Sequence, residues 1–286
     1  MHAPSYVLTL AAVLACGLSA TPARADVRFG PVLAGAGQSV RLVSHTTTVG
    51  GTIKVENGGR ASNGTILYSR DRDLTWTFRN PAADGSLRGM VTIAKINTSA
   101  TTTIDGKSEK SAEASPLNGK MFAMSKAVKG DWKFELDGSV PLREIDHEIS
   151  ELTLYLKRKW YPQRSVKAGE SWEFDPAWIR MLIQRDLKDA QTIGTMNLAQ
   201  IVHSANGDSA IIKVSVRSTG ADFRPDGSEA SAQIELSGQV VVNLKTMLDE
   251  SLRLKGTVIS RTGKPGNTKT VTLPVQLEVT KTLVNN

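Results

Sequence analysis

Apolar side chains alternate with polar ones over most of residues 210–279, and this alternation limits the possible folds more than any other feature. A strand points successive side chains to opposite faces, so each run has one apolar face and one polar face. Such faces are typical of antiparallel strands that cover a core on one side and meet water on the other. The apolar positions are Ala210, Ile212, Val214 and Val216; Ile234, Leu236, Val240, Val242 and Leu244; Leu252, Leu254 and Val258; and Val271, Leu273, Val275, Leu277 and Val279.

The N-terminal part of the chain has the same character, with turn signals between alternating runs. Asn-Gly begins at positions 57, 63, 118 and 206, and Asp-Gly at 84, 105, 137 and 226. These dipeptides accept the positive φ angles of tight hairpin turns. The small-residue stretch from Asn97 to Ser115 predicts a long exposed hairpin. Pro274 cannot donate a ladder hydrogen bond, which predicts that its strand lies at an edge or is bulged there.

Two mid-chain segments break the alternation. Residues 141–159 carry apolar side chains every three or four positions, with acidic residues first and Lys157–Lys159 last, an order that complements a helix dipole. In residues 175–189, Asp175 fits an N-cap and Pro176 the first helical position, ahead of a second apolar stripe. We therefore expect an α+β fold: a predominantly antiparallel, one-sided and curved β-sheet with two mid-chain helices.

The same patterns divide the chain into four regions. We expect a signal peptide over residues 1–25, an N-terminal antiparallel β region over 26–138, a two-helix connecting segment over 139–189, and a C-terminal antiparallel meander over 190–286. No low-complexity linker separates the two β regions. Residues 26–286 therefore also fit one continuous domain.

The first residues have the layout of an export signal. An apolar run from Tyr6 to Ala20 precedes an A-x-A site ending at Ala25. This run is shorter than the roughly 20 residues of a membrane-spanning helix and matches a secretory signal. We expect cleavage after Ala25, which leaves a periplasmic or secreted bacterial protein with no transmembrane segment in the mature chain. In the alternative, residues 13–16 (VLAC) act as a lipobox and Cys16 carries a lipid anchor.

Charge narrows the range of partners. The formal net charge of +7 is modest for 286 residues and predicts a mildly basic surface, not a nucleic-acid binder. An exported chain would instead meet lipid or another envelope component.

Catalytic and metal-binding motifs are missing from the sequence. Outside the expected signal peptide, the histidines are His45, His147 and His203, and they are scattered. No H-E-x-x-H, C-x-x-C, calcium loop or G-x-S-x-G motif occurs. We therefore expect no catalytic residue, no metal site and no cofactor, and we interpret the protein as non-enzymatic.

The stretch KRKWYPQRSVKAGESW, residues 157–172, combines cations, aromatics and a turn. One interpretation is structural: the cations close a helix, Pro162 stops it, and Gly169 supplies a positive φ in a turn between Val166 and Trp172. The other is a partner-contact patch, because exposed aromatics beside cations are typical of contact surfaces. The patch would consist of Lys157, Arg158, Lys159, Trp160 and Tyr161.

The turn also carries a family resemblance. Its pattern of a proline followed by V-x-x-G-[DE]-x-W resembles one in uncharacterised exported proteins and lipoproteins of bacteria; the matching residues are Pro162, Val166, Gly169, Glu170 and Trp172. An upstream L-x-G-K-x-F segment and short tryptophan-containing strand match at Leu117, Gly119, Lys120, Phe122 and Trp132. A hairpin from Gly238 to Gly256 completes the likeness, which covers about residues 117–256 and implies a family of unknown function without catalytic residues.

Two functions fit these patterns. In the first, an exported, non-enzymatic envelope protein binds an apolar or amphipathic ligand in its curved sheet. In the second, a structural or assembly component acts through the basic-aromatic patch at residues 157–161.

Overall fold

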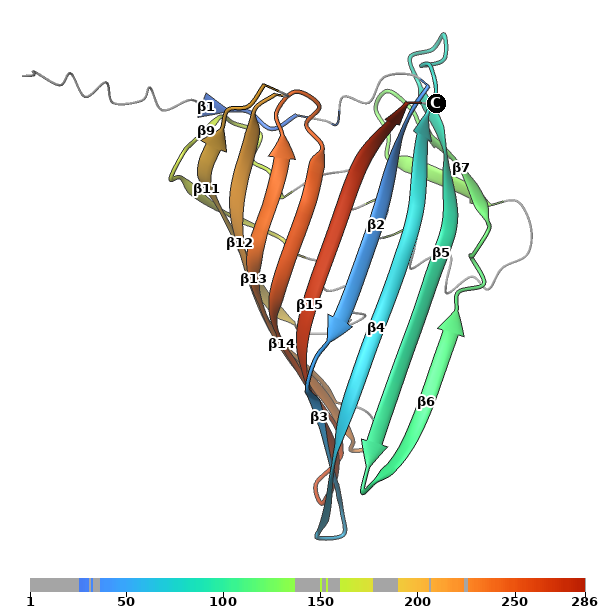
Figure 1. The fold of residues 1–286 in the computed structure, drawn as a ribbon, viewed down its shortest axis with the longest axis vertical. Coiled ribbons are helices and arrows are strands. Elements are labelled where there is room, and N and C mark those ends of the chain that lie inside the picture. The colour runs from blue at the N-terminus through green and yellow to red at the C-terminus, as the bar shows by residue number, and fades with distance from the viewer. Residues whose placement is uncertain are drawn as a thin grey trace, which may run out of the picture.

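The computed structural model describes residues 26–30, 32, 37–136, 150, 153, 160–176, 190–205, 207–223 and 226–285. Every element of this part of the chain is a β-strand (Figure 1). The strands are β1 (Asp26–Val27), β2 (Gln38–Thr48), β3 (Gly51–Asn57), β4 (Arg60–Phe78), β5 (Leu87–Ile104), β6 (Lys107–Ala114), β7 (Met121–Lys126), β8 (Trp132–Leu136), β9 (Val166–Lys167), β10 (Ser171–Phe174), β11 (Gln191–Val202), β12 (Ser209–Phe223), β13 (Glu229–Asn243), β14 (Asp249–Lys264) and β15 (Asn267–Asn285).

Thirteen of the strands form one antiparallel sheet. Its order is β10-β11-β12-β13-β14-β15-β2-β4-β5-β7-β8, with β3 paired to both β15 and β4, and β6 paired to β5. The sheet curves and tapers from a wide end near β1 and β9 to a narrow end at the β3–β4 hairpin (Figure 1). The last strand, β15, lies between β14 and β2 and so joins the C-terminal strands to the N-terminal ones.

The predicted apolar alternation is confirmed. One face of the sheet, here called the inner face, carries the buried side chains, and the outer face carries the exposed ones. The predicted apolar positions of β12, β13 and β14 up to Val242 and Val258 are all buried, as are Val275, Leu277 and Val279 of β15. Leu74 and Trp76 of β4 join the same core cluster, so strands from both ends of the chain share one core.

The predicted α+β class is wrong. The described residues form a nearly all-β structure, with Ser150 and Thr153 as the helical exceptions, and the core cluster contains only strand and loop side chains. The curved sheet supplies the covering for its own apolar face, since β2, β4 and β5 share a core with β11–β15. Apart from Ser150, Thr153, Asp175 and Pro176, the two predicted helices lie outside the described residues.

Two glycines occupy inner-face positions where neighbouring strands approach closely. A Cβ atom on Gly238 would lie 1.9 Å from the carbonyl oxygen of Arg253, and a Cβ on Gly256 would lie 1.9 Å from that of Glu235. Gly238 pairs with Leu254, and Gly256 pairs with Leu236 on the next inner-face row. Glycines at such positions let a sheet bend sharply. The pair therefore marks a corner in β13 and β14.

Candidate functional site

The inner face of the curved sheet is the site that the sequence predicts for a ligand. Over β11–β15 this face is lined mainly by buried aliphatic side chains, together with the buried polar residues Ser218, Ser260 and Lys281. Over β2 and β4 the inward-facing side chains change from apolar to polar along each strand. The buried polar residues there are Ser44, Thr46, Thr48, Arg70 and Arg72.

Arg70 and Arg72 were not identified by sequence reasoning. Their side chains are only 3% and 2% exposed. Both continue the period-two phase of Leu74 and Trp76, so the alternation of β4 contained the signal that they point inward. A buried guanidinium group is tolerated only with hydrogen-bonding or charged surroundings. The inner face therefore carries a buried polar region on β2 and β4 next to its apolar region.

The aromatic part of the predicted contact patch is buried. Trp160 and Tyr161 are each 4% exposed and belong to the core cluster. Neither aromatic ring is therefore available to an external partner. Lys157, Arg158 and Lys159 lie outside the described residues.

Trp160 and Tyr161 instead form an aromatic cluster with Phe29 and Trp172. The ring of Phe29 stacks on Tyr161 with centroids 4.4 Å apart, and its centroid lies 6.1 Å from that of Trp172. The Trp172 indole donates a hydrogen bond of 2.8 Å to the backbone carbonyl of Trp160. Because β1 also pairs with β9, this aromatic cluster attaches the segment around Asp26–Phe29 to the segment around Trp160–Trp172.

A buried polar contact ties the aromatic cluster to the sheet. The Tyr161 hydroxyl donates a hydrogen bond of 2.8 Å to Asp249 Oδ1 at the start of β14. The Lys281 ammonium group lies 3.5 Å from Asp249 Oδ2, and the two side chains are 7% and 9% exposed. Tyr161, Asp249 and Lys281 thus connect the β9 region, β14 and β15 within the core.

The turn motif is built into the same region, and each member has a physical role. Val166 is fully buried, and Gly169 has φ 87°. The Glu170 carboxylate accepts a hydrogen bond of 2.9 Å from the backbone N–H of Lys167 and pairs with Arg164. The Lys167 hydrogen bond, followed by Arg164, lowers the pKa of Glu170 below its ordinary value. Pro162 lies just before the turn and is partly exposed.

Replacing Gly169 should destabilise the turn, and the loss should be larger for residues that rarely adopt a positive φ. We expect Gly169→Val to lower the free energy of unfolding by about 1–3 kcal/mol. Gly169→Asn should have a smaller effect because asparagine tolerates positive φ. Urea denaturation of both variants tests this expectation. Equal losses would show that the φ angle is not the cause.

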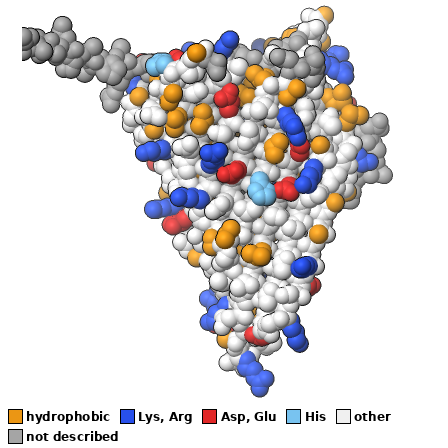
Figure 2. Space-filling model, viewed as in Figure 1, with side chains coloured by type: hydrophobic (Ala, Val, Ile, Leu, Met, Phe, Trp, Pro, Cys, Tyr) orange, Lys and Arg blue, Asp and Glu red, His pale blue; other side chains and the backbone are white. Residues whose placement is uncertain are grey.

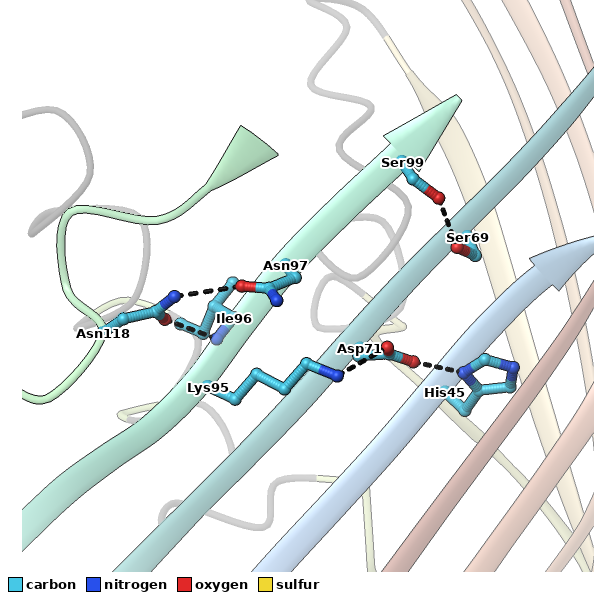
Figure 3. A network of polar contacts seen from close by, with 8 residues as sticks. All are labelled: His45, Ser69, Asp71, Lys95, Ile96, Asn97, Ser99 and Asn118. Atoms are coloured by element: carbon cyan, nitrogen blue, oxygen red, sulfur yellow. Dashed lines mark hydrogen bonds and ion pairs between the residues drawn. The ribbon is translucent and has the colours of Figure 1, made fainter. Parts of the chain in front are cut away.

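A second polar network lies on the outer face (Figure 3). His45 Nδ1 lies 2.5 Å from Asp71 Oδ1, and the Lys95 ammonium donates a hydrogen bond of 2.9 Å to Asp71 Oδ2. All three side chains are exposed and come from the adjacent strands β2, β4 and β5. His203 pairs with Asp208 at the end of β11, and the four strands β12–β15 separate β11 from β2. The two histidines therefore do not share a site.

Close to this network, Asn118 holds a turn against β5 (Figure 3). Its side-chain oxygen accepts a hydrogen bond of 2.6 Å from the Ile96 N–H, and its amide donates one of 3.0 Å to Asn97. The turn places Leu117 in the core, fully buried. The L-x-G-K-x-F segment thus docks onto the sheet beside a register shift in the β4–β5 pair.

The network should also contribute to stability in a pH-dependent way. Hydrogen bonds to Lys95 first and to His45 second lower the pKa of Asp71 below its ordinary value of 3.8. A carboxyl with a lowered pKa stabilises the fold above its ordinary pKa, and this contribution is lost as pH falls through the lowered one. We expect Asp71→Asn and Lys95→Met each to reduce the stability difference between about pH 7 and about pH 3, by less than about 1 kcal/mol for this exposed pair. Urea denaturation midpoints at both pH values measure this stability difference. If the difference is the same in Asp71→Asn as in the unmodified protein, the expectation is wrong.

Two further findings concern metal-binding clusters and membrane-spanning helices. Among the described residues, no three His, Cys, Asp or Glu side chains gather so that they could hold a metal ion. Within the same part of the chain, no helix has the length and apolar character needed to cross a bilayer.

Comparisons with known proteins give no family. No family model and no curated protein matches the chain. Among solved structures, a beta-barrel-like protein of the domain of unknown function DUF1849 from Brucella abortus aligns over 88% of this chain and 100% of its own, with 8% identity and a TM-score of 0.17. An outer membrane channel from Pseudomonas putida F1 aligns over 88% of this chain and 97% of its own, with 7% identity and a TM-score of 0.18. TM-scores this low do not establish a shared fold, so any functional inference must come from the residues themselves.

Proposed function

We propose that the protein is an exported, non-enzymatic component of the bacterial envelope that binds an amphipathic ligand against the inner face of its curved sheet. The observation that carries this proposal is the composition of that face. Apolar side chains line most of it, including Leu42 and Leu74 of β2 and β4, whereas hydroxyl and guanidinium groups line the adjoining parts of β2 and β4 that contain Thr46 and Arg72. A ligand with an apolar part and a polar part matches both regions.

Two further features support the proposal. The N-terminal sequence has the layout of an export signal, which puts lipids and other amphipathic molecules within reach. The outer face carries mainly charged and hydroxyl side chains, with a few exposed apolar ones such as Leu67 and Ile193, and so suits contact with water. With apolar groups inside and polar groups outside, the protein would shield an apolar ligand part from water.

Burial of Trp160 and Tyr161 removes the support for the alternative function. A contact patch at residues 157–161 needs exposed aromatic rings, and those rings are in the core. We therefore do not propose the basic-aromatic patch as the functional surface.

Native mass spectrometry of the protein purified from the bacterial periplasm tests the proposed function. We expect a mass excess that organic extraction removes and that small-molecule analysis identifies as an amphipathic lipid. Protein unfolded in urea, freed of lipid and refolded should then bind a fluorescent fatty acid saturably. Absence of both the mass excess and saturable fatty-acid binding would overturn the proposal.

A second experiment distinguishes fatty-acid binding at the inner face from binding at the outer surface. Thr46→Val removes an inner-face hydroxyl at nearly constant volume, and Thr47→Val makes the same change at the next, outward-facing position of β2. We expect Thr46→Val to change the affinity for the fatty acid and Thr47→Val to leave it unaltered. Equal effects would place the fatty acid elsewhere.

A further inference from the structure

The outer face of β10–β15 is hollowed by a groove that the proposed function does not use. The groove has a volume of about 760 Å³ and runs across the strands. Two neighbouring rows of outward-facing residues line it, and the strand pairing aligns both rows. Met196, Val214, Gly238, Leu254 and Leu277 complete the lining between these rows. The first row is Ser171, Asn197, Lys213, Gln239, Arg253 and Glu278; the second is Thr195, Ser215, Ser237, Lys255 and Gln276.

Side-chain size explains why this surface is hollow. In the second row, Ser215 and Ser237 are short and lie side by side on β12 and β13. Long side chains flank them, with Lys213 and Gln239 in the first row and Lys255 on the next strand. The hydroxyls therefore form a floor between longer polar walls.

Cations dominate the charge of the groove. Lys213, Arg253 and Lys255 line it together with a single acid, Glu278. Arg253 and Glu278 lie 3.9 Å apart and are 69% and 65% exposed, so they interact weakly. In the described part of the chain, neither Lys213 nor Lys255 forms an ion pair. Basic side chains also gather over this part of the face in Figure 2.

The chemistry of the groove selects among classes of ligand. No aromatic side chain is present for stacking, which disfavours a nucleobase, and the outward-facing side chains of both rows are all polar. The backbone groups of β11–β15 are already used in the sheet, so an extended peptide could not add as a strand along the groove. Hydroxyl and amide side chains both donate and accept hydrogen bonds, which suits a polyhydroxylated ligand.

From these features we infer that the outer groove binds a segment of an acidic polysaccharide. The sugar hydroxyls meet the serine floor and the amides, and the carboxylates meet Lys213, Arg253 and Lys255. Neighbouring strands are about 4.8 Å apart, so Lys213 and Arg253, which are separated by one strand, are about 10 Å apart along the groove. Such spacing suits a linear chain with recurring charge, and the open shape suits a segment of a longer polymer.

Binding of oligogalacturonate, a linear acidic oligosaccharide, tests this inference by isothermal titration calorimetry. We expect saturable binding that weakens with added salt, and no binding of maltodextrin of equal length. The double variant Lys213→Glu/Lys255→Glu should lower the affinity roughly ten- to hundredfold. The matched control is Lys107→Glu/Lys110→Glu on exposed β6, which makes the same change in net charge outside the groove.

The inference fails if both double variants lose affinity equally, because net charge would then be the cause. It also fails if the folded protein does not bind oligogalacturonate, including the case in which it binds only vesicles containing phosphatidylglycerol. Circular dichroism of each variant verifies that the fold is retained. The proposed inner-face ligand is unaffected by either result, because fatty-acid binding is measured separately.

Discussion

Gly238→Ala should destabilise the protein by about 3 kcal/mol or more, although it adds only one methyl group. That methyl would lie 1.9 Å from the carbonyl oxygen of Arg253 and 3.0 Å from the Cα of Leu254. Both obstacles are backbone atoms of the paired strand, so no rotamer change can relieve the overlap. The ladder between β13 and β14 must open or shift at the corner, and the buried side chains beside it must repack.

Urea unfolding followed by tryptophan fluorescence measures this loss. Gly30→Ala is the matched control, because a Cβ at Gly30 has no heavy atom within 4 Å and its φ is not positive. Gly256→Ala, at the other side of the corner, should be as harmful as Gly238→Ala. The double variant should lose less than the sum of the two, since one opening of the ladder relieves both overlaps. Similar stability of Gly30→Ala and Gly238→Ala would contradict the close approach.

Asp249→Asn should lower the free energy of unfolding by about 3–5 kcal/mol, the range for breaking a buried ion pair from one side. The amide keeps the shape of the side chain but removes the charge that lies 3.5 Å from the buried Lys281 ammonium. It also weakens the acceptor of the Tyr161 hydroxyl. Three separate segments, the β9 region, β14 and β15, therefore lose their shared contact.

A double-variant cycle tests the origin of that loss. Lys281→Met should also destabilise the fold, and Asp249→Asn combined with Lys281→Met should recover part of the loss because no charge remains buried in the pair. Lys264→Gln is the surface control: its pair with Asp226 spans 3.9 Å with both side chains more than half exposed, and should contribute less than about 1 kcal/mol. A double variant no more stable than the worse single one would contradict this account.

Local periodicity explains which parts of the fold were predictable. The inward phase of Ile212, Leu236 and Leu254 follows from alternation within each strand, because a strand's faces are set by its own backbone. The long β5–β6 hairpin follows from its small residues and the Asp105–Gly106 turn. Neither inference needs knowledge of any partner strand.

The predictions that failed concern positions whose structure depends on strands distant in the sequence. Asn63–Gly64 is the same dipeptide as the Asn57–Gly58 turn, yet it lies inside β4, where a Cβ on Gly64 would be 2.0 Å from a carbonyl oxygen of β5. Pro274 belongs to the central strand β15, opposite the gap between the residues paired with β2 and those paired with β3. The edge alternative is therefore wrong, whereas the interrupted pairing at Pro274 agrees with the expected local irregularity.

For the candidate sites as well, local sequence patterns do not reveal contacts between distant segments. Trp160 and Tyr161 are buried by Phe29 and Asp249, which no local pattern connects to them. The outer groove takes one or two ordinary polar residues from each of six strands, so only the register reveals it. Arg70 and Arg72 are different, because the alternation within β4 contained the signal for their inward direction, although they were not identified by sequence reasoning.

The position of β15 has a consequence for how the molecule assembles. β15 comes last in chain order, yet it pairs with β14 on one side and with β2 and β3 on the other. Before β15 is in place, β14 and β2 both present unpaired edges, and the N-terminal strands cannot join the C-terminal meander. Such distant pairing makes folding slow, because the ends of a long chain must meet first. In the folded sheet, β15 is therefore the strand that connects the C-terminal meander to the N-terminal strands.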